Sequence, residues 1–272
     1  MQSLSTKQFL LIAGALLLVV LLYFAPKSGE QKLHEDDAHN HSENSSADPI
    51  AGAKKMLNEN TLKKIEELEK QNNAEAFDQI VAILDTTQQP LASAIFAEKS
   101  ARLKNTEVAW QNAADHFFFA ASFTIPSEKQ LAYEGAIRSY EKVLELNPNN
   151  IDAQINLGAC YVEASSEPMK GIGLLRAVLE KDSTNIKAHL NLGLFSVKSA
   201  QYDKAIERFT KILDIDPNYI EAYLYIGDVY EQKGDINNAI KNYELYVSAV
   251  KNPTIAADVT RYIEKLKKGI TN

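Results

Sequence analysis

The stretch that decides the fold consists of three consecutive segments: IDAQINLGACYVEASSEPMKGIGLLRAVLEKDSTN (151–185), IKAHLNLGLFSVKSAQYDKAIERFTKILDIDPNY (186–219) and IEAYLYIGDVYEQKGDINNAIKNYELYVSAVKNP (220–253). When they are aligned on Gly158, Gly193 and Gly227, the period is 34 to 35 residues. A glycine inside a helix costs about 1 kcal/mol relative to alanine. Three glycines in register therefore indicate a helix crossing too close for a side chain, and such a period is typical of a helical solenoid.

Two further columns repeat with the same period. Small residues recur at Ala136, Gly171, Ala205 and Ala239, and large apolar residues follow four positions later at Tyr140, Leu175, Phe209 and Tyr243. Together with the Leu157-Gly158 pair and the closing Pro148 and Pro217, this pattern resembles the tetratricopeptide repeat family. The resemblance implies an all-α, right-handed superhelical solenoid of helix-turn-helix repeats. It also implies a scaffold that binds protein or peptide partners.

Segments on both sides extend the predicted array. A divergent unit at 106–150 carries Trp110 in the aromatic column, and its two helices must absorb about ten extra residues relative to the repeat length. Ser127 and Gln130 predict a capping box at the start of its second helix. Pro90 separates two further predicted helices, at 74–85 and 91–104, and a charged helix is expected over about 61–72.

The expected organisation follows from these segments. It comprises a short cytoplasmic tail (1–8), a transmembrane signal anchor (9–25), an acidic, His-containing disordered linker (26–52), an N-terminal helical cap (53–105), the divergent repeat (106–150), three good repeats (151–185, 186–219 and 220–253) and a C-terminal capping helix (254–272). Solenoids need such polar-backed ends because the last repeat otherwise exposes its stacking face to water.

The second strong signal is the uncharged stretch FLLIAGALLLVVLLYFA at 9–25, which as a helix spans about 25 Å, close to a bilayer core. A cleaved signal peptide is the alternative, but no small residue stands two positions before Ala25. We therefore expect a single-pass protein of the inner (cytoplasmic) membrane. A short N-terminal tail normally stays in the cytoplasm, which puts the repeats on the extracytoplasmic side, in the periplasm if the cell is a Gram-negative bacterium. The positive charges flanking the span are nearly balanced, with Lys7 before it and Lys27 and Lys32 after it, so they favour neither orientation.

The linker and the overall charge predict neither a metal site nor a nucleic-acid partner. His34, His39 and His41 lie near carboxylates, but a tract without apolar periodicity offers no fixed ligand geometry. The formal net charge of −7 argues against phosphate-backbone binding, which needs a concentrated basic face.

The sequence also predicts no enzyme, no cofactor and no small-molecule substrate. It contains no glycine-rich phosphate loop, no zinc-spaced Cys/His set and no Gly-flanked serine nucleophile. The single cysteine, Cys160, takes an inward position on its predicted helix, where a buried small hydrophobe is expected rather than a nucleophile.

The resemblance places the binding site on the first helices, whose fifth, sixth, ninth and thirteenth positions face the concave groove in this family. The candidate partner-binding residues are Asn156, Glu163, Leu190, Asn191, Leu194, Tyr225 and Asp228. Asn side chains can hold a peptide backbone through paired donor and acceptor groups. Ile155 and Leu224 are expected to add to an apolar floor, and the alternative is that several of these side chains pack against the neighbouring repeat.

Family members that clamp a terminal carboxylate use basic and Asn residues on three successive first helices. The matching places here are Gln111, Asp115, Asn156, Lys187 and Asn191, of which only Asn156 and Lys187 agree. Asp115 adds a repelling charge, so an apolar or basic segment is the expected ligand. Two functions remain open: a membrane-tethered adaptor, and a structural subunit of a membrane enzyme or transporter complex, for example of the cytochrome c maturation type.

Overall fold

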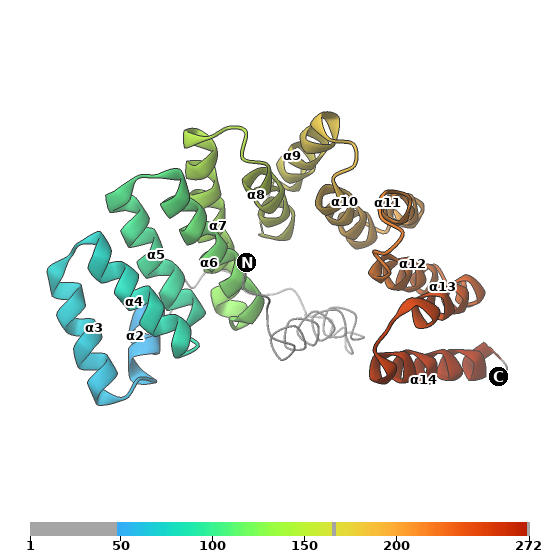
Figure 1. The fold of residues 1–272 in the computed structure, drawn as a ribbon, viewed down its shortest axis with the longest axis horizontal. Helices are drawn as coiled ribbons and strands as arrows, with labels where there is room; N and C mark the ends of the chain where they lie inside the picture. The colour runs from blue at the N-terminus through green and yellow to red at the C-terminus, as the bar shows by residue number, and fades with distance from the viewer. Residues whose placement is uncertain (1–47, 165–166, 271–272) are drawn as a thin grey trace, which may run out of the picture. The chain divides into compact units, whose positions relative to one another are not determined.

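The computed structural model describes residues 48–164 and 167–270, and these residues form helices and connecting turns without a strand. The helices are α2 (Pro49–Lys55), α3 (Glu59–Gln71), α4 (Ala74–Thr86), α5 (Pro90–Lys104), α6 (Glu107–Phe123), α7 (Pro126–Leu146), α8 (Ile151–Ala164), α9 (Pro168–Lys181), α10 (Ile186–Lys198), α11 (Tyr202–Ile215), α12 (Glu221–Gln232), α13 (Ile236–Ala249) and α14 (Pro253–Ile270). Figure 1 shows that they follow one another in chain order.

From α3 onward each helix packs mainly against its neighbours in the chain, as the predicted solenoid requires, while α2 packs on α5. Five helical pairs result, α4/α5, α6/α7, α8/α9, α10/α11 and α12/α13, and α14 packs on α13. The first helix α8 also contacts the first helices α6 and α10 on either side of it. The divergent unit has the long helices expected of it, with 17 residues in α6 and 21 in α7.

The glycine column is explained by the large residue of the paired helix. A Cβ atom on Gly227 would lie 2.5 Å from the Tyr243 ring, and a Cβ on Gly193 would overlap the Phe209 ring. At Gly158 the added atom would lie 3.0 Å from Leu175. The close crossing predicted from sequence is therefore confirmed, and in two of the three units an aromatic ring fills the space that the missing side chain leaves.

Two polar residues occupy the aromatic column of the family, and both bind the preceding turn. Gln154 donates from Nε2 to the Pro148 carbonyl at 2.6 Å, and His189 Nε2 lies 3.0 Å from the Ser183 carbonyl. Both side chains are buried, and burial lowers the pKa of His189. Each partner stands six residues earlier. A neutral hydrogen bond thus replaces the aromatic contact at the start of two repeats.

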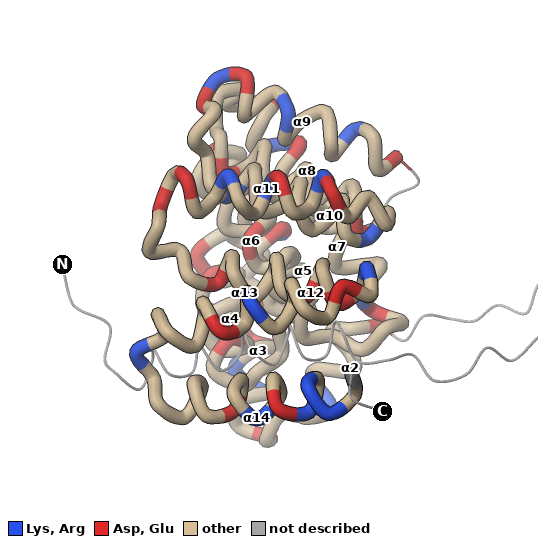
Figure 2. The backbone as a smooth tube through the Cα atoms, turned by 90° about the vertical axis from the view of Figure 1, so that its right-hand side faces the viewer, with Lys and Arg blue, Asp and Glu red and all other residues tan. Residues whose placement is uncertain are grey.

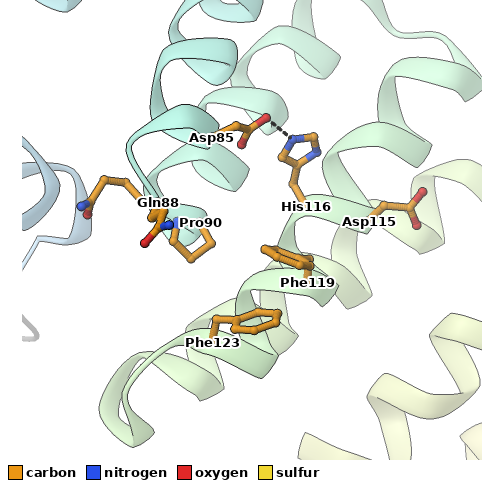
Figure 3. Close-up of a pocket in the computed structure, with 8 residues that line it drawn as sticks. Asp85, Gln88, Pro90, Asp115, His116, Phe119 and Phe123 are labelled. Atoms are coloured by element: carbon orange, nitrogen blue, oxygen red, sulfur yellow. Dashed lines mark hydrogen bonds and ion pairs between the residues drawn. The ribbon is translucent and has the colours of Figure 1, made fainter. Parts of the chain in front are cut away.

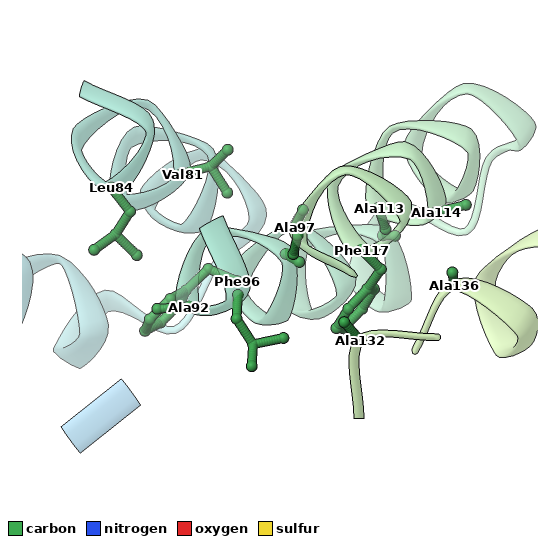
Figure 4. Close-up of a cluster of buried hydrophobic side chains, with 14 of the residues drawn as sticks. Val81, Leu84, Ala92, Phe96, Ala97, Ala113, Ala114, Phe117, Ala132 and Ala136 are labelled. Atoms are coloured by element: carbon green, nitrogen blue, oxygen red, sulfur yellow. The ribbon is translucent and has the colours of Figure 1, made fainter. Parts of the chain in front are cut away.

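The N-terminal helices share one large core. It runs from Ala53 to Cys160 and is unusually rich in alanine, as the close-up in Figure 4 shows for Ala92, Ala97, Ala113 and Ala132 around Phe96 and Phe117. Small side chains allow helices to approach closely. Phe117 then covers Gly135 of α7, where an added Cβ would lie 2.5 Å from the ring.

The structure corrects three boundaries. Helix α2 begins at Pro49, inside the stretch assigned to the linker, because Asp48 caps it by accepting from the Ile50 amide. Helix α7 begins at Pro126 without a side-chain cap, so Ser127 lies inside it and the predicted capping box is wrong. Proline fits the first turn of a helix because its missing N–H would have no partner there. Gly269, expected to end the last helix, lies within α14.

The predicted membrane anchor (9–25) and nearly all of the predicted linker fall outside the described residues. Among the helices that the structure does describe, none combines the length and apolar character needed to cross a bilayer.

Candidate functional site

The predicted groove residues lie on α8, α10 and α12, and most of them are half-buried. Those of intermediate exposure are Asn156, Glu163, Leu190, Asn191, Leu194, Tyr225 and Asp228. Leu190, Leu194 and Tyr225 pack onto the core formed by α11 and α12, and Tyr225 stacks on Phe209 with ring centroids 5.2 Å apart. One expected floor residue differs: Ile155 is buried in the core between repeats, as is Ala159 on the same helix, so Ile155 cannot line a groove.

The two asparagines keep part of their hydrogen-bonding capacity. Asn156 donates from Nδ2 to the Tyr140 hydroxyl at 3.0 Å, and Asn191 donates from Nδ2 to the Lys187 carbonyl at 2.8 Å. In both cases the amide nitrogen is used within the fold. The side-chain oxygen is then the atom that each asparagine can offer to a backbone N–H of a ligand.

The two acidic groove residues are not free charges. Glu163 forms an ion pair with Lys198 of α10 at 3.1 Å. Asp228 accepts from Tyr243 at 2.6 Å, while its second oxygen, Oδ2, is buried without a partner. Burial, with the nearby Glu231 charge, raises the pKa of Asp228 to about 7, although the Tyr243 bond opposes the shift. Neither carboxyl group therefore offers a free negative charge to a ligand in the groove.

Asp228 belongs to a cluster that links α12, α13 and α14. The Tyr243 hydroxyl lies 2.6 Å from Asp228 and 3.0 Å from Glu231, and Tyr262 of α14 donates to Glu231 at 2.7 Å. A phenol has one proton, so both Tyr243 contacts are hydrogen bonds only when one carboxyl group supplies its own. This geometry agrees with the raised pKa of Asp228.

A hollow of about 340 Å³, which we name the central pocket, lies where α6, α8 and α10 meet. It is lined by Gln111, Asp115, Asn150, Asp152, Asn156 and Lys187. The structure thus brings together four of the five positions compared with a carboxylate clamp. Lys187 is paired with Asp152 at 2.7 Å, and Asp115 accepts from Tyr140 at 2.7 Å and from Gln111 at 2.9 Å. With two carboxylates to one ammonium, the pocket disfavours an anionic ligand.

A larger hollow of about 770 Å³, the aromatic pocket, lies next to it. Its lining comes from the end of α4, the turn into α5 and the concave side of α6, and comprises Asp85, Gln88, Gln89, Pro90, Asp115, His116, Phe119 and Phe123. Figure 3 shows Phe119 and Phe123 side by side, with Asp85 and His116 joined above them. The two rings have centroids 4.4 Å apart and remain 57% and 56% exposed. Exposed aromatic groups of this kind mark interaction surfaces.

The sequence analysis missed this pocket although a signal was present. With Trp110 in the aromatic column, Asp115 and Phe119 take the ninth and thirteenth positions of the divergent unit, which are groove positions in the family. In that unit Asp115 was compared only with the carboxylate clamp, and Phe119 was not predicted as a groove residue. Asp85 belongs to the N-terminal cap and had no repeat register to reveal it.

The structure shows no arrangement for metal binding or nucleophilic chemistry in the part of the chain that it describes. No group of three or more His, Cys, Asp or Glu side chains there is placed to hold a metal ion. Cys160 is buried, as predicted, and burial raises the pKa of its thiol, which suppresses the reactive thiolate. Figure 2 shows Lys and Arg interspersed with Asp and Glu along α11, with basic residues at the C-terminal end of α14.

Comparison with known proteins identifies the repeats. A TPR repeat model matches residues 132–164 and 197–234, and a tetratricopeptide repeat model matches residues 220–249. The chain therefore contains tetratricopeptide repeats. The fold of solved structures agrees: PilW, a type IV pilus biogenesis factor, has a TM-score of 0.54 at 17% identity, covering 72% of this chain and 86% of PilW. MamA has a TM-score of 0.50 at 21% identity, covering 65% of this chain and 91% of MamA.

Curated relatives match over part of the chain. Hsp70-Hsp90 organizing protein 1 of Glycine max is 34% identical over 104 residues, which is 38% of this chain and 18% of the relative. Hsp70-Hsp90 organizing protein 2 of Arabidopsis thaliana is 31% identical over 90 residues, which is 33% of this chain and 16% of the relative. The chain thus spans less than a fifth of the length of these relatives. Families that contain TPR repeats are typically protein-interaction modules.

Proposed function

We propose that this protein is a membrane-tethered adaptor that binds a segment of a partner protein along the surface of α6, α8, α10 and α12. The observation that supports it most is the continuity of this surface. The central pocket, the asparagine oxygens of Asn156 and Asn191, and the half-buried Leu190, Leu194 and Tyr225 follow one another along successive first helices. Polar groups that can hold a backbone thus alternate with apolar side chains that can hold anchors.

The relatives suggest the class of ligand but not its terminal group. The names of the curated relatives describe organisers of two chaperones, Hsp70 and Hsp90. In this chain, the paired Lys187 and the carboxylate of Asp115 make a free carboxylate an unfavourable guest. We therefore assign to the groove an internal or basic segment of a partner rather than an acidic C-terminus.

Binding can be tested with the full chain in mild detergent and a displayed library of random peptides. The double variant Asn191→Ala/Leu194→Asp should lose the selected peptides by about a hundredfold, since a few buried contacts carry most recognition energy. Its fold should survive because both side chains are only half-buried, and thermal unfolding of the variant checks this. Thr210→Ala/Met169→Asp, which changes exposed residues of the second helices α11 and α9, is the matched control. If the control loses the peptides and the groove variant keeps them, the binding surface lies on the second helices.

The tether is the second part of the proposal. Residues 9–25 are long and apolar enough to span a bilayer. The full chain should stay with membranes after alkaline extraction, and a chain lacking residues 1–25 should not. Protease added outside an intact cytoplasmic membrane should cut the repeats if the N-terminus is inside. Complete protection of the repeats would indicate the opposite orientation. Release of the full chain by alkali would contradict the predicted membrane tether.

A further inference from the structure

The aromatic pocket combines an apolar wall with negative charge. Phe119 and Phe123 form the wall, with the two rings in contact and exposed. Asp85 and Asp115 contribute carboxylates, and the lining contains neither lysine nor arginine. The pocket therefore places two carboxyl groups beside two exposed rings.

His116 and Asp85 form the polar edge of the pocket. Nδ1 of His116 lies 2.8 Å from the Asn112 carbonyl, and Nε2 lies 3.3 Å from Oδ2 of Asp85. Ser93 donates to the other oxygen of Asp85, Oδ1, at 2.5 Å. A carboxylate can accept several hydrogen bonds, so Asp85 keeps accepting capacity for a guest that brings N–H donors.

From this geometry, and resting on the proposed function, we propose that the aromatic pocket binds a lysine or arginine side chain of the partner segment. The aliphatic stem lies along Phe119 and Phe123, and the cationic head donates toward Asp85 and His116. A cation near an aromatic face is attracted by the ring quadrupole, and long basic side chains place their stems on apolar surface.

Charge and position favour this guest over the other occupants. A phosphorylated or carboxylate-bearing segment would meet the carboxyl groups of Asp85 and Asp115, and a purely apolar anchor would cover them without donating a hydrogen bond. Asp115 lines both the aromatic pocket and the central pocket. A peptide that follows the first helices into the central pocket can therefore continue into the aromatic pocket.

The test is a double-mutant cycle on the full chain in mild detergent. Peptides are selected from the displayed random library on the unmodified protein, and one selected peptide is remade with norleucine in place of its basic residue. Norleucine keeps an aliphatic side chain but removes the charge. We expect selected peptides to be enriched in Lys or Arg. The norleucine change should cost about tenfold in affinity with the unmodified protein and less than about twofold with Asp85→Asn.

The wall is tested by Phe119→Ala, which should weaken the basic peptide by about tenfold. Met169→Ala, which removes a side chain 66% exposed on α9, should leave its affinity unchanged. Thermal unfolding of Asp85→Asn should match that of the parent chain, because an amide oxygen still accepts from Ser93. If Asp85→Asn has a lower thermal midpoint than the parent chain, the affinity of Phe119→Ala for the basic peptide tests the proposal instead.

The two proposals fail in different ways. If selected peptides lack basic residues, or the norleucine change costs the same with and without Asp85, this inference is overturned. The proposed function then stands as long as Asn191→Ala/Leu194→Asp still abolishes binding. If no peptide is retained by the unmodified protein, both proposals are overturned.

Discussion

The N-terminal region (α2–α7) and the regular repeats (α8–α13) use the same helical pairs but build their cores differently. One core, packed largely with alanine, extends from Ala53 through the first region and into α8 as far as Cys160. In the second region the buried residues divide into separate clusters, one around Leu175, one around Phe209 and one around Tyr243. Regular repeats contact mainly their neighbours, so stability there is a sum of local interfaces. A continuous core instead favours unfolding as one unit.

The largest effect should come from deleting a ring in each region. Phe117→Ala and Phe209→Ala both remove side chains that are at most 1% exposed, and each should cost about 4 kcal/mol. Hydrogen exchange should distinguish them. Phe117→Ala should remove protection across α4 to α7, whereas Phe209→Ala should remove it mainly in α10 to α13. Equal extents of lost protection would show that the two cores do not differ in cooperativity.

Each region contains a helix glycine that packs against an aromatic ring, and a side chain added at that glycine should destabilise both regions to a similar extent. Gly193→Leu forces a side chain into the Phe209 ring, and Gly135→Leu does the same against Phe117. Each should cost about 3 kcal/mol, because overpacking a rigid crossing displaces the helices. Gly173→Leu is the matched control, since a Cβ there meets nothing within 4 Å. A thermal midpoint of Gly193→Leu equal to that of the control would mean that α10 and α11 separate easily.

The smallest effect concerns Asp228 and depends on pH. Burial raises the folded pKa of Asp228 to about 7, well above the usual value of an aspartate, so folding favours the protonated form. The stability from this group is complete below about pH 4, falls as pH rises, and is lost above about pH 7. The free energy of unfolding of Asp228→Asn should therefore exceed that of the parent by about 2 kcal/mol at pH 8. At pH 4 the two values should be nearly equal. The same gain at both values would exclude ionisation as the cause.

The sequence predicted the regular repeats well because their determinants are local. The columns of Gly158, Gly193 and Gly227 and of their large partners depend on spacing alone, and the structure confirms each contact. The start of α7 was missed because Pro126 can begin a helix as readily as Ser127 can cap one. The site was harder to predict. Ile155 takes a groove position in sequence but is buried between repeats, since the crossing of α8 with its neighbours decides where that face points.

The hydrogen bonds of the candidate site depend on contacts between elements that periodicity does not encode. Tyr140 donates to Asp115 and Tyr243 donates to Asp228, so the first and last units share the same phenol–carboxylate bond. The intervening units have Ala159 and Leu194 at the carboxylate position and Leu175 and Phe209 at the ring position. In all four units the two positions are thus either both polar or both apolar, a correlation within the chain that becomes visible only when the partners are known.

The phenol–carboxyl cluster at the end of the array also governs how the array frays. An internal helix has a neighbour on both sides, but among the described helices α14 packs mainly on α13, so in a one-dimensional array it is the first element to detach. Tyr262 also binds α14 to α12 by donating to Glu231, and Lys267 adds an ion pair with Glu244 of α13. Tyr243 lies within hydrogen-bond distance of both Glu231 and Asp228, so the bonds that hold the last described helix are coupled to the ionisation of Asp228.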